Sequence, residues 1–227
     1  EESPDEDVIR FDLGGTESMV LRKNAFGMAR LEVTNTFANS FIGMDAGTAI
    51  VNGSYNTAHG ANALSSLTTS SNNTATGYNA LHANINGVGN TAMGNNALQA
   101  NTTGNHNAAL GGSTLFSNTT GYGNVAIGER ALYLNPDRSN LVAVGDSALY
   151  HNGSVAFFTY QATGNTALGS KCLFSNTLGF DNTAAGNNAL FSSQTASFNT
   201  AFGAMALNMA NSRSEERRVG KECRSRW

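Results

Sequence analysis

The chain has 227 residues, a formal net charge of −3, an aromatic fraction of 8% and only two prolines. Much of its apolar fraction of 40% is Ala, so large apolar side chains are too few for the core of a conventional α/β enzyme. Segment 35–212 holds 29 Asn and only eight charged residues, which excludes strong attraction to phosphates, and no run of 18 apolar residues could cross a membrane. We therefore expect no nucleic-acid partner and no membrane span in this sequence.

The N-terminal segment 1–34 differs from the rest in composition. Residues 1–7 are acidic and are predicted to be a disordered end. In 8–34, Ile9, Phe11 and Leu13 alternate with polar residues, the spacing of a half-buried strand, and the Gly pair at 14–15 offers a turn before a second apolar run. We expect a β-hairpin that caps the following array, because exposed strand edges invite aggregation.

Segment 35–212 contains ten copies of the pattern N-x-A-x-G. Asn stands four positions before the glycine in nine copies, Ala two positions before it in nine, and Leu four positions after it in nine. The glycines recur with a constant period of 17, apart from a single gap of 24: Gly43, Gly60, Gly77, Gly94, Gly111, Gly128, Gly145, Gly169, Gly186 and Gly203. A fixed period with a fixed order of residue types is typical of a solenoid.

Each copy is too short for a helix and rich in turn residues. Two strands of four or five residues, joined by Gly and Asn turns that accept positive φ, fit a repeat of this length. The predicted fold class is therefore all-β, a parallel β-solenoid (β-roll) of about ten 17-residue repeats. At about 4.8 Å per coil, the rod is expected to be roughly 45 Å long.

Neither face of the predicted strand carries charge. One face holds the Ala column, and the other holds large apolar residues directly before the glycine in seven copies: Ile42, Met93, Leu110, Ile127, Val144, Leu168 and Phe202. A narrow coil has a single interior, so the second face needs another surface. An identical chain is the simplest partner, which predicts a symmetric oligomer.

The repeats resemble those of a known family. "NVAIGERAL" (124–132) and "NTALGSKCL" (165–173) look like the head repeats of trimeric autotransporter adhesins, and the "NTTG" links are similar to phage-tail-fibre-like arrays often followed by an endosialidase-type intramolecular chaperone. The resemblance implies a left-handed β-roll in a homotrimer, located extracellularly at a cell surface or on a virion. The repeat is longer in this chain than in the adhesin heads.

The gap of 24 places a loop insertion at 150–164. It brings together four apolar residues that are candidates for a contact loop: Val155, Phe157, Phe158 and Tyr160. Insertions in solenoids map to loops on one face, and apolar loop tips can be contact sites. The alternative is a side loop that packs against its own rod.

No pattern predicts catalysis, a cofactor or a metal. "GVGNTA" (87–92) and "GYGNVA" (121–126) match a dinucleotide pattern only because they lie in register with the repeat. Cys172 stands in an Ala column, where it is read as a small apolar substitute. The histidines fall in four different columns: His59, His82, His106 and His151. We expect no enzymatic activity.

Residues 213–227 break the period and resemble a translated sequencing adapter, so we expect a non-native tail and an array cut short. For segment 35–212 the sequence favours a structural or adhesive repeat region of a surface adhesin or tail-fibre-like protein. Such a region would be a rigid trimeric rod that presents binding surfaces to a host-surface protein or glycan. The alternative is a glycan- or ice-binding solenoid module whose Asn and Thr rows form the contact surface.

Overall fold

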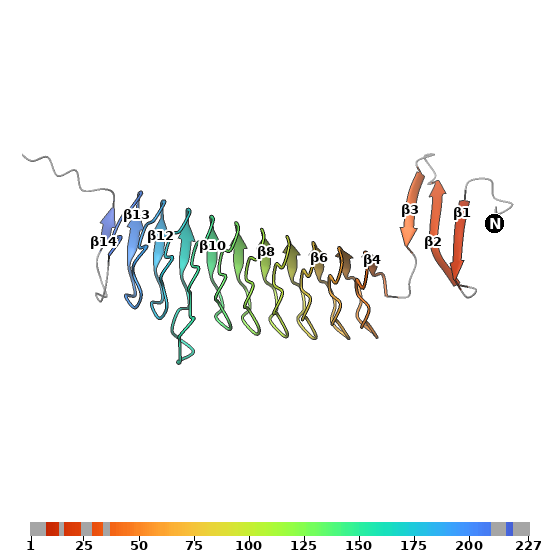
Figure 1. Cartoon of the computed structure of the whole chain (residues 1–227), viewed down its shortest axis with the longest axis horizontal. Coiled ribbons are helices and arrows are strands. Elements are labelled where there is room, and N and C mark those ends of the chain that lie inside the picture. The colour runs from red at the N-terminus through yellow and green to blue at the C-terminus, as the bar shows by residue number, and fades with distance from the viewer. Residues whose placement is uncertain (1–7, 14–15, 24–28, 34–36, 210–216, 220–227) are drawn as a thin grey trace, which may run out of the picture.

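The computed structural model describes residues 8–13, 16–23, 29–33, 37–209 and 217–219, with side chains described within 37–209. These residues form two separate sheets and no helix (Figure 1). The smaller sheet is antiparallel, in the order β1 (Val8–Leu13), β2 (Thr16–Lys23), β3 (Ala29–Val33). The predicted turn at 14–15 and the predicted disordered end 1–7 lie outside the described residues, and the capping role stays a prediction.

The larger sheet is parallel and belongs to a solenoid, which confirms the predicted fold class. Neighbouring strands pair in register, so that Thr57 faces Thr74 and Ala58 faces Ala75, its equivalent in the next repeat. The ten repeat strands are β4 (Ser40–Ile42), β5 (Thr57–His59), β6 (Thr74–Thr76), β7 (Thr91–Met93), β8 (Ala108–Leu110), β9 (Val125–Ile127), β10 (Val142–Val144), β11 (Thr166–Leu168), β12 (Thr183–Ala185) and β13 (Thr200–Phe202). A further strand, β14 (Arg217–Val219), pairs with β13 from within the adapter-like tail.

Each coil has one strand of three residues, so the expectation of two strands of four or five residues was wrong. After Gly60 the chain takes positive φ at Asn62 (58°) and again at Leu64 (52°), which bends it out of extended geometry. Hydrogen bonds to the neighbouring coils continue nevertheless, for example from Leu64 N to Ala80 O at 3.1 Å. The Leu residues four positions after the repeat glycine therefore form corners of the coil, in addition to the Gly and Asn turns that the sequence predicts.

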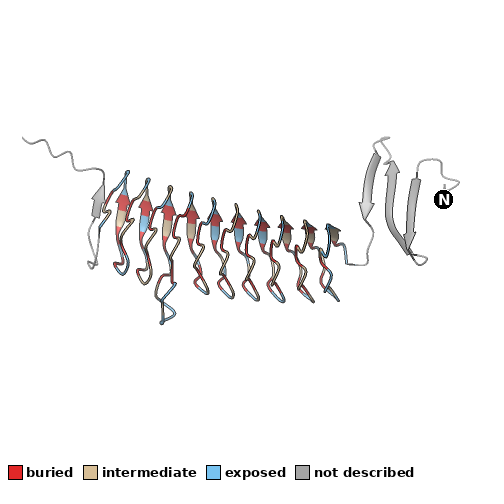
Figure 2. Cartoon of the chain, viewed as in Figure 1, coloured by how far each residue is buried: buried red, intermediate tan, exposed pale blue. Residues whose placement is uncertain are grey.

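Buried residues recur at equivalent positions of successive coils (Figure 2), and their side chains stack in columns that form the core. The central Ala of each strand from β5 to β13 is buried, and so are the second Ala column and the Leu column that follow the glycine. From Gly43 to Gly186, the glycines of the N-x-A-x-G pattern have no room for a side chain, and their positive φ also favours glycine. A Cβ at Gly94, where φ is +142°, would overlap the carbonyl oxygen of Gly111 in the next coil.

Two buried Asn columns run along this interior as hydrogen-bonded ladders. In the first, Asn107 Nδ2 donates to Asn90 Oδ1 (3.2 Å) and to Gly121 O (2.8 Å), while Asn107 Oδ1 accepts from Asn124 N (3.1 Å). The second ladder consists of Asn84, Asn101, Asn118, Asn135, Asn152 and Asn176. These amides satisfy backbone groups at the corners, which explains why a buried column can be polar.

Half-buried aromatic rings form another column on the surface of the rod. Five rings stack on one another from coil to coil at centroid distances of 5.0 to 5.1 Å: Phe116, Tyr133, Tyr150, Phe174 and Phe191. This spacing is close to the distance between hydrogen-bonded strands, about 4.8 Å, so identical positions in successive coils stack without distortion.

Candidate functional site

The outer side of the parallel sheet is exposed along the rod. In each strand from β5 to β13 the middle residue is buried, while the residues before and after it are half-buried or exposed; in β4 the middle residue, Phe41, is half-buried. The structure therefore places the Ala face inside the coil, a choice between the two strand faces that the sequence left open. The other face, which we call the outer strand face, consists of the residues at the first and third positions of β4 to β13. It carries exposed Ile42, Met93, Leu110, Val125, Ile127, Leu168 and Phe202.

The Thr row and the Asn rows of the alternative hypothesis lie in different environments. Thr91 and Thr183 are exposed on the outer strand face, but Ala108, Val125 and Val142 interrupt this row. The Asn ladders lie inside the coil, where their side chains are fully buried. The buried ladders therefore offer no contact surface, whereas the Thr row and a half-buried Asn row, Asn62, Asn79 and Asn96, lie at the surface.

The insertion of the long coil lies between β10 and β11 and projects from the rod (Figure 1). Arg138, which is only 5% exposed, reaches into it from the preceding coil. Its Nη1 donates to Phe158 O (3.0 Å) and its Nη2 to Ala156 O (2.9 Å), while its Nε lies 3.2 Å from Asp137 Oδ1. At the tip, Gln161 Oε1 accepts from the backbone N of Phe157 and of Phe158, each at 2.9 Å. The backbone of 156–158 is therefore held both by the preceding coil and from within the insertion.

Three of the four predicted contact residues belong to a larger cluster of rings. Phe157 contacts Phe158 edge to face (5.3 Å between centroids), Phe158 stacks on Tyr160 (5.7 Å), and Tyr160 meets Phe180 edge to face (5.7 Å). Phe180 in turn contacts Phe198 at 5.0 Å. We call these five residues the aromatic band. The fourth predicted residue, Val155, is aliphatic and is exposed in the same insertion beside this cluster.

Sequence reasoning missed three members of this arrangement. Phe180 and Phe198 lie in the two coils that follow the insertion, and Arg138 precedes it. Arg138 occupies a corner that is Gly in most coils: its carbonyl oxygen accepts from Asn135 Nδ2, as Gly121 O accepts from Asn118 Nδ2. A large charged residue in a Gly column, one coil before the insertion, was the available signal.

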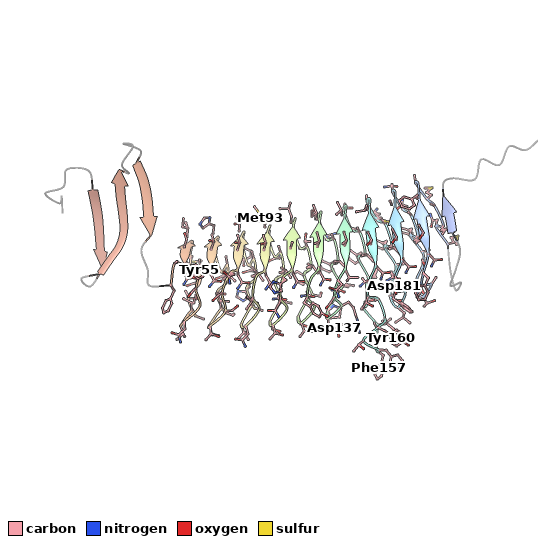
Figure 3. The ribbon with its side chains drawn as sticks, turned by 180° about the vertical axis from the view of Figure 1, so that it is seen from behind. Tyr55, Met93, Asp137, Phe157, Tyr160 and Asp181 are labelled. Carbon is pink, nitrogen blue, oxygen red and sulfur yellow. The ribbon has the colours of Figure 1, made fainter. Side chains whose placement is uncertain are left out.

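The loop end of the aromatic band and the outer strand face lie on opposite sides of the rod, whereas Asp181, the neighbour of Phe180, lies between them (Figure 3). Figure 3 places Phe157 and Tyr160 at the end of the projecting loop and Met93 at the strand edge on the other side.

The remaining chemistry-bearing side chains are dispersed. His82 Nδ1 lies 2.7 Å from Ser65 Oγ, and the His151 ring packs edge-on against Tyr150 and Phe174. Within 37–209, no three His, Cys, Asp or Glu side chains gather closely enough to hold a metal. Cys172 is buried in its Ala column, and burial raises the pKa of its thiol to about 12. Over the same residues, the structure contains no helix that could cross a membrane.

No known protein family, curated protein or solved structure matches this chain.

Proposed function

We propose that this chain is the structural and adhesive repeat region of a surface adhesin or tail-fibre-like protein. In this proposal three copies associate into one rigid rod outside the cell or on a virion. The rod then holds binding surfaces away from the body that carries it. The outer strand face is the observation that carries the proposal.

This face combines length, apolar character and lack of charge. Exposed apolar side chains occur on it at Ile42 and then recur from Met93 to Phe202, while β5 and β6 present Thr and His side chains there. Contiguous apolar patches of more than a few hundred Å² on a soluble protein mark interaction sites. Equivalent positions recur on this face at about 4.8 Å spacing, so a parallel copy of this chain can align with it coil by coil.

The oligomeric state tests the proposal directly. Sedimentation of the full chain should give the mass of three copies. A double variant, Met93→Asp and Ile127→Asp, should sediment as a single chain, because six carboxylates in the trimer would have to be desolvated at the contact. The control variant, Thr103→Asp with Thr120→Asp, adds the same charge at exposed corners away from the strands and should remain trimeric.

A well-folded single chain at micromolar concentration would overturn the homotrimer. Circular dichroism of the double variant separates loss of association from loss of folding. The variant should keep the β-signal of the parent, since both substituted side chains are exposed in the single chain.

A further inference from the structure

We propose that the aromatic band is a binding site for an uncharged linear glycan. The inference rests on the proposed function, in which the rod presents binding surfaces, and it names the ligand class that one of these surfaces takes. The observation that supports this inference is the continuous row of rings from Phe157 in the loop to Phe198, two coils further along the rod.

The band is elongated along the rod axis. Each ring contacts the next at 5.0 to 5.7 Å, and the row passes from the insertion to Phe180 in the coil of β12 and then to Phe198 in the coil of β13. The backbone confirms that these coils are adjacent, because Phe198 N donates to Phe180 O at 3.1 Å. A row of this shape suits a polymer lying along the rod.

The rings are exposed to an unusual degree for such large apolar groups. Phe157 is 88% exposed, and Phe158, Tyr160 and Phe198 each expose more than half of their surface. Sugar rings have apolar C–H faces and a rim of hydroxyl groups. Aromatic side chains offer a matching apolar surface, and the Tyr160 hydroxyl, together with exposed Ser154 and Thr159, offers polar groups beside it.

The charge around the band favours a neutral ligand. The insertion, 150–164, contains no Asp, Glu, Lys or Arg. The Arg138 guanidinium is buried and engaged with the carbonyl groups of the loop, so it offers no cation to a phosphate or sulfate. Asp181, which is exposed next to Phe180, would repel anionic polymers. Nucleic acids also stack on aromatic rows, but they require a cationic groove.

The site is already formed without a ligand. Arg138 fixes the carbonyl groups of Ala156 and Phe158, Gln161 fixes the backbone at the tip, and Thr163 Oγ1 donates to Tyr160 O at 2.7 Å. A preorganised loop loses little conformational entropy on binding. Three copies on one trimer would add the avidity of repeated sites on one polymer.

Two other occupants fit the row less well. A loop that inserts into a bilayer would concentrate its apolar side chains at the tip, whereas here the row turns back along the side of the rod to Phe198. A second copy of this chain would bury the outer strand face first, since that face is far longer than the band.

Affinity electrophoresis of the full chain tests the proposal. The gels contain hydroxyethyl cellulose, galactomannan or dextran, three neutral polysaccharides of different linkage. We expect at least one of them to retard the parent chain. Two double variants should bind that polysaccharide with an apparent affinity at least ten-fold lower than that of the parent: Phe157→Ser with Phe158→Ser, and Phe180→Ser with Phe198→Ser. The matched control, Tyr55→Ser with Tyr122→Ser, removes two exposed rings from the same corner columns as Phe198 and Phe180 and should bind like the parent.

Each opposite result overturns the glycan site. The first is that the parent chain migrates in all three gels as it does in a gel without polysaccharide. The second is that the band variants are retarded as strongly as the parent. The third is that the chain floats with phosphatidylcholine vesicles and binds none of the polysaccharides. Sedimentation of the same samples keeps the two proposals apart. A trimer that ignores all three polysaccharides refutes the glycan site alone, and a single chain that binds one of them refutes the trimer alone.

Discussion

Arg138 Nη1 donates a hydrogen bond to the carbonyl oxygen of Phe158 at 3.0 Å, joining two residues that are 20 positions apart and lie in successive coils. Together with the bond from Nη2 to Ala156 O, it ties the insertion to the regular part of the rod. The Asn ladders use the corner backbone of Arg138, as they use glycine elsewhere, while its side chain leaves the column to hold the loop. One substitution in the repeat thus accommodates an irregularity in the next coil.

Arg138→Ala should loosen the insertion without unfolding the rod. Alanine already occupies this corner at Ala196, so the coil accepts it. The loop loses two hydrogen bonds from a charged donor, about 2 kcal/mol or more. Hydrogen exchange at the amides of Phe157, Phe158 and Gln161 should accelerate by roughly ten-fold or more, with protection of the strands unchanged. Arg130→Ala, which removes an exposed arginine, is the control, and equal exchange in both variants would argue against the anchoring role.

Gly94→Ala should destabilise the rod severely. The new Cβ would collide with Gly111 O, and φ of +142° strains any residue other than glycine. We expect a loss of about 3 kcal/mol or more in the free energy of unfolding, measured by urea denaturation. Gly112→Ala is the matched control, because a Cβ there meets no atom within 4 Å; its effect should stay within about 1 kcal/mol. Similar midpoints for the two variants would contradict the close packing of the glycine column.

Ser193→Asn should stabilise the protein by extending the second Asn ladder. The ladder ends at Asn176, whose buried Oδ1 has no hydrogen-bond partner. Ser193 stands at the next position of this column, one repeat further along the chain. An asparagine there can donate Nδ2 to Asn176 Oδ1 and to Ala196 O, as Asn176 does to Asn152 Oδ1 and Gly179 O. We expect a gain of about 1 kcal/mol and a higher Tm. Ser192→Asn, one position away, should have no such effect, and a lower Tm for Ser193→Asn would count against the ladder geometry.

Cys172 should react with thiol reagents only when the rod unfolds. Burial raises the pKa of this thiol from 9.0 to about 12, so almost no thiolate forms in the folded state at pH 8. The raised pKa also makes stability depend on pH. The unfolded chain releases the proton above pH 9 and the folded chain does not, so this contribution is complete below pH 9 and is lost as the pH rises toward 12.

Two measurements check this prediction in a Cys223→Ser background, in which Cys172 is the only thiol. The labelling rate should follow the fraction unfolded in urea. The urea midpoint should fall between pH 9 and 11 more steeply than in a further Cys172→Ala variant, which restores the residue type of the column. Rapid labelling of the folded rod would show that the column is open to solvent.

The sequence by itself determined the period and the register, while only the structure placed the Ala column inside the coil. The period and the register follow from repetition alone, because identical segments that stack in parallel must align each residue with its equivalent in the next copy. The uncharged outer strand face and the apolar character of the insertion were also readable, since they depend only on residue types at fixed positions.

The tertiary structure alone decided how each coil closes. Leu64 and its equivalents adopt positive φ against the ordinary preference of leucine, with their side chains buried in the interior and their backbone hydrogen-bonded to the neighbouring coils. Contacts between successive coils also bury the Asn ladders, leave each coil with one strand, and bring Arg138, Phe180 and Phe198 to the insertion. Contacts between successive coils depend on the shape of the turns, and the shape of a turn is fixed by the stack rather than by any single copy.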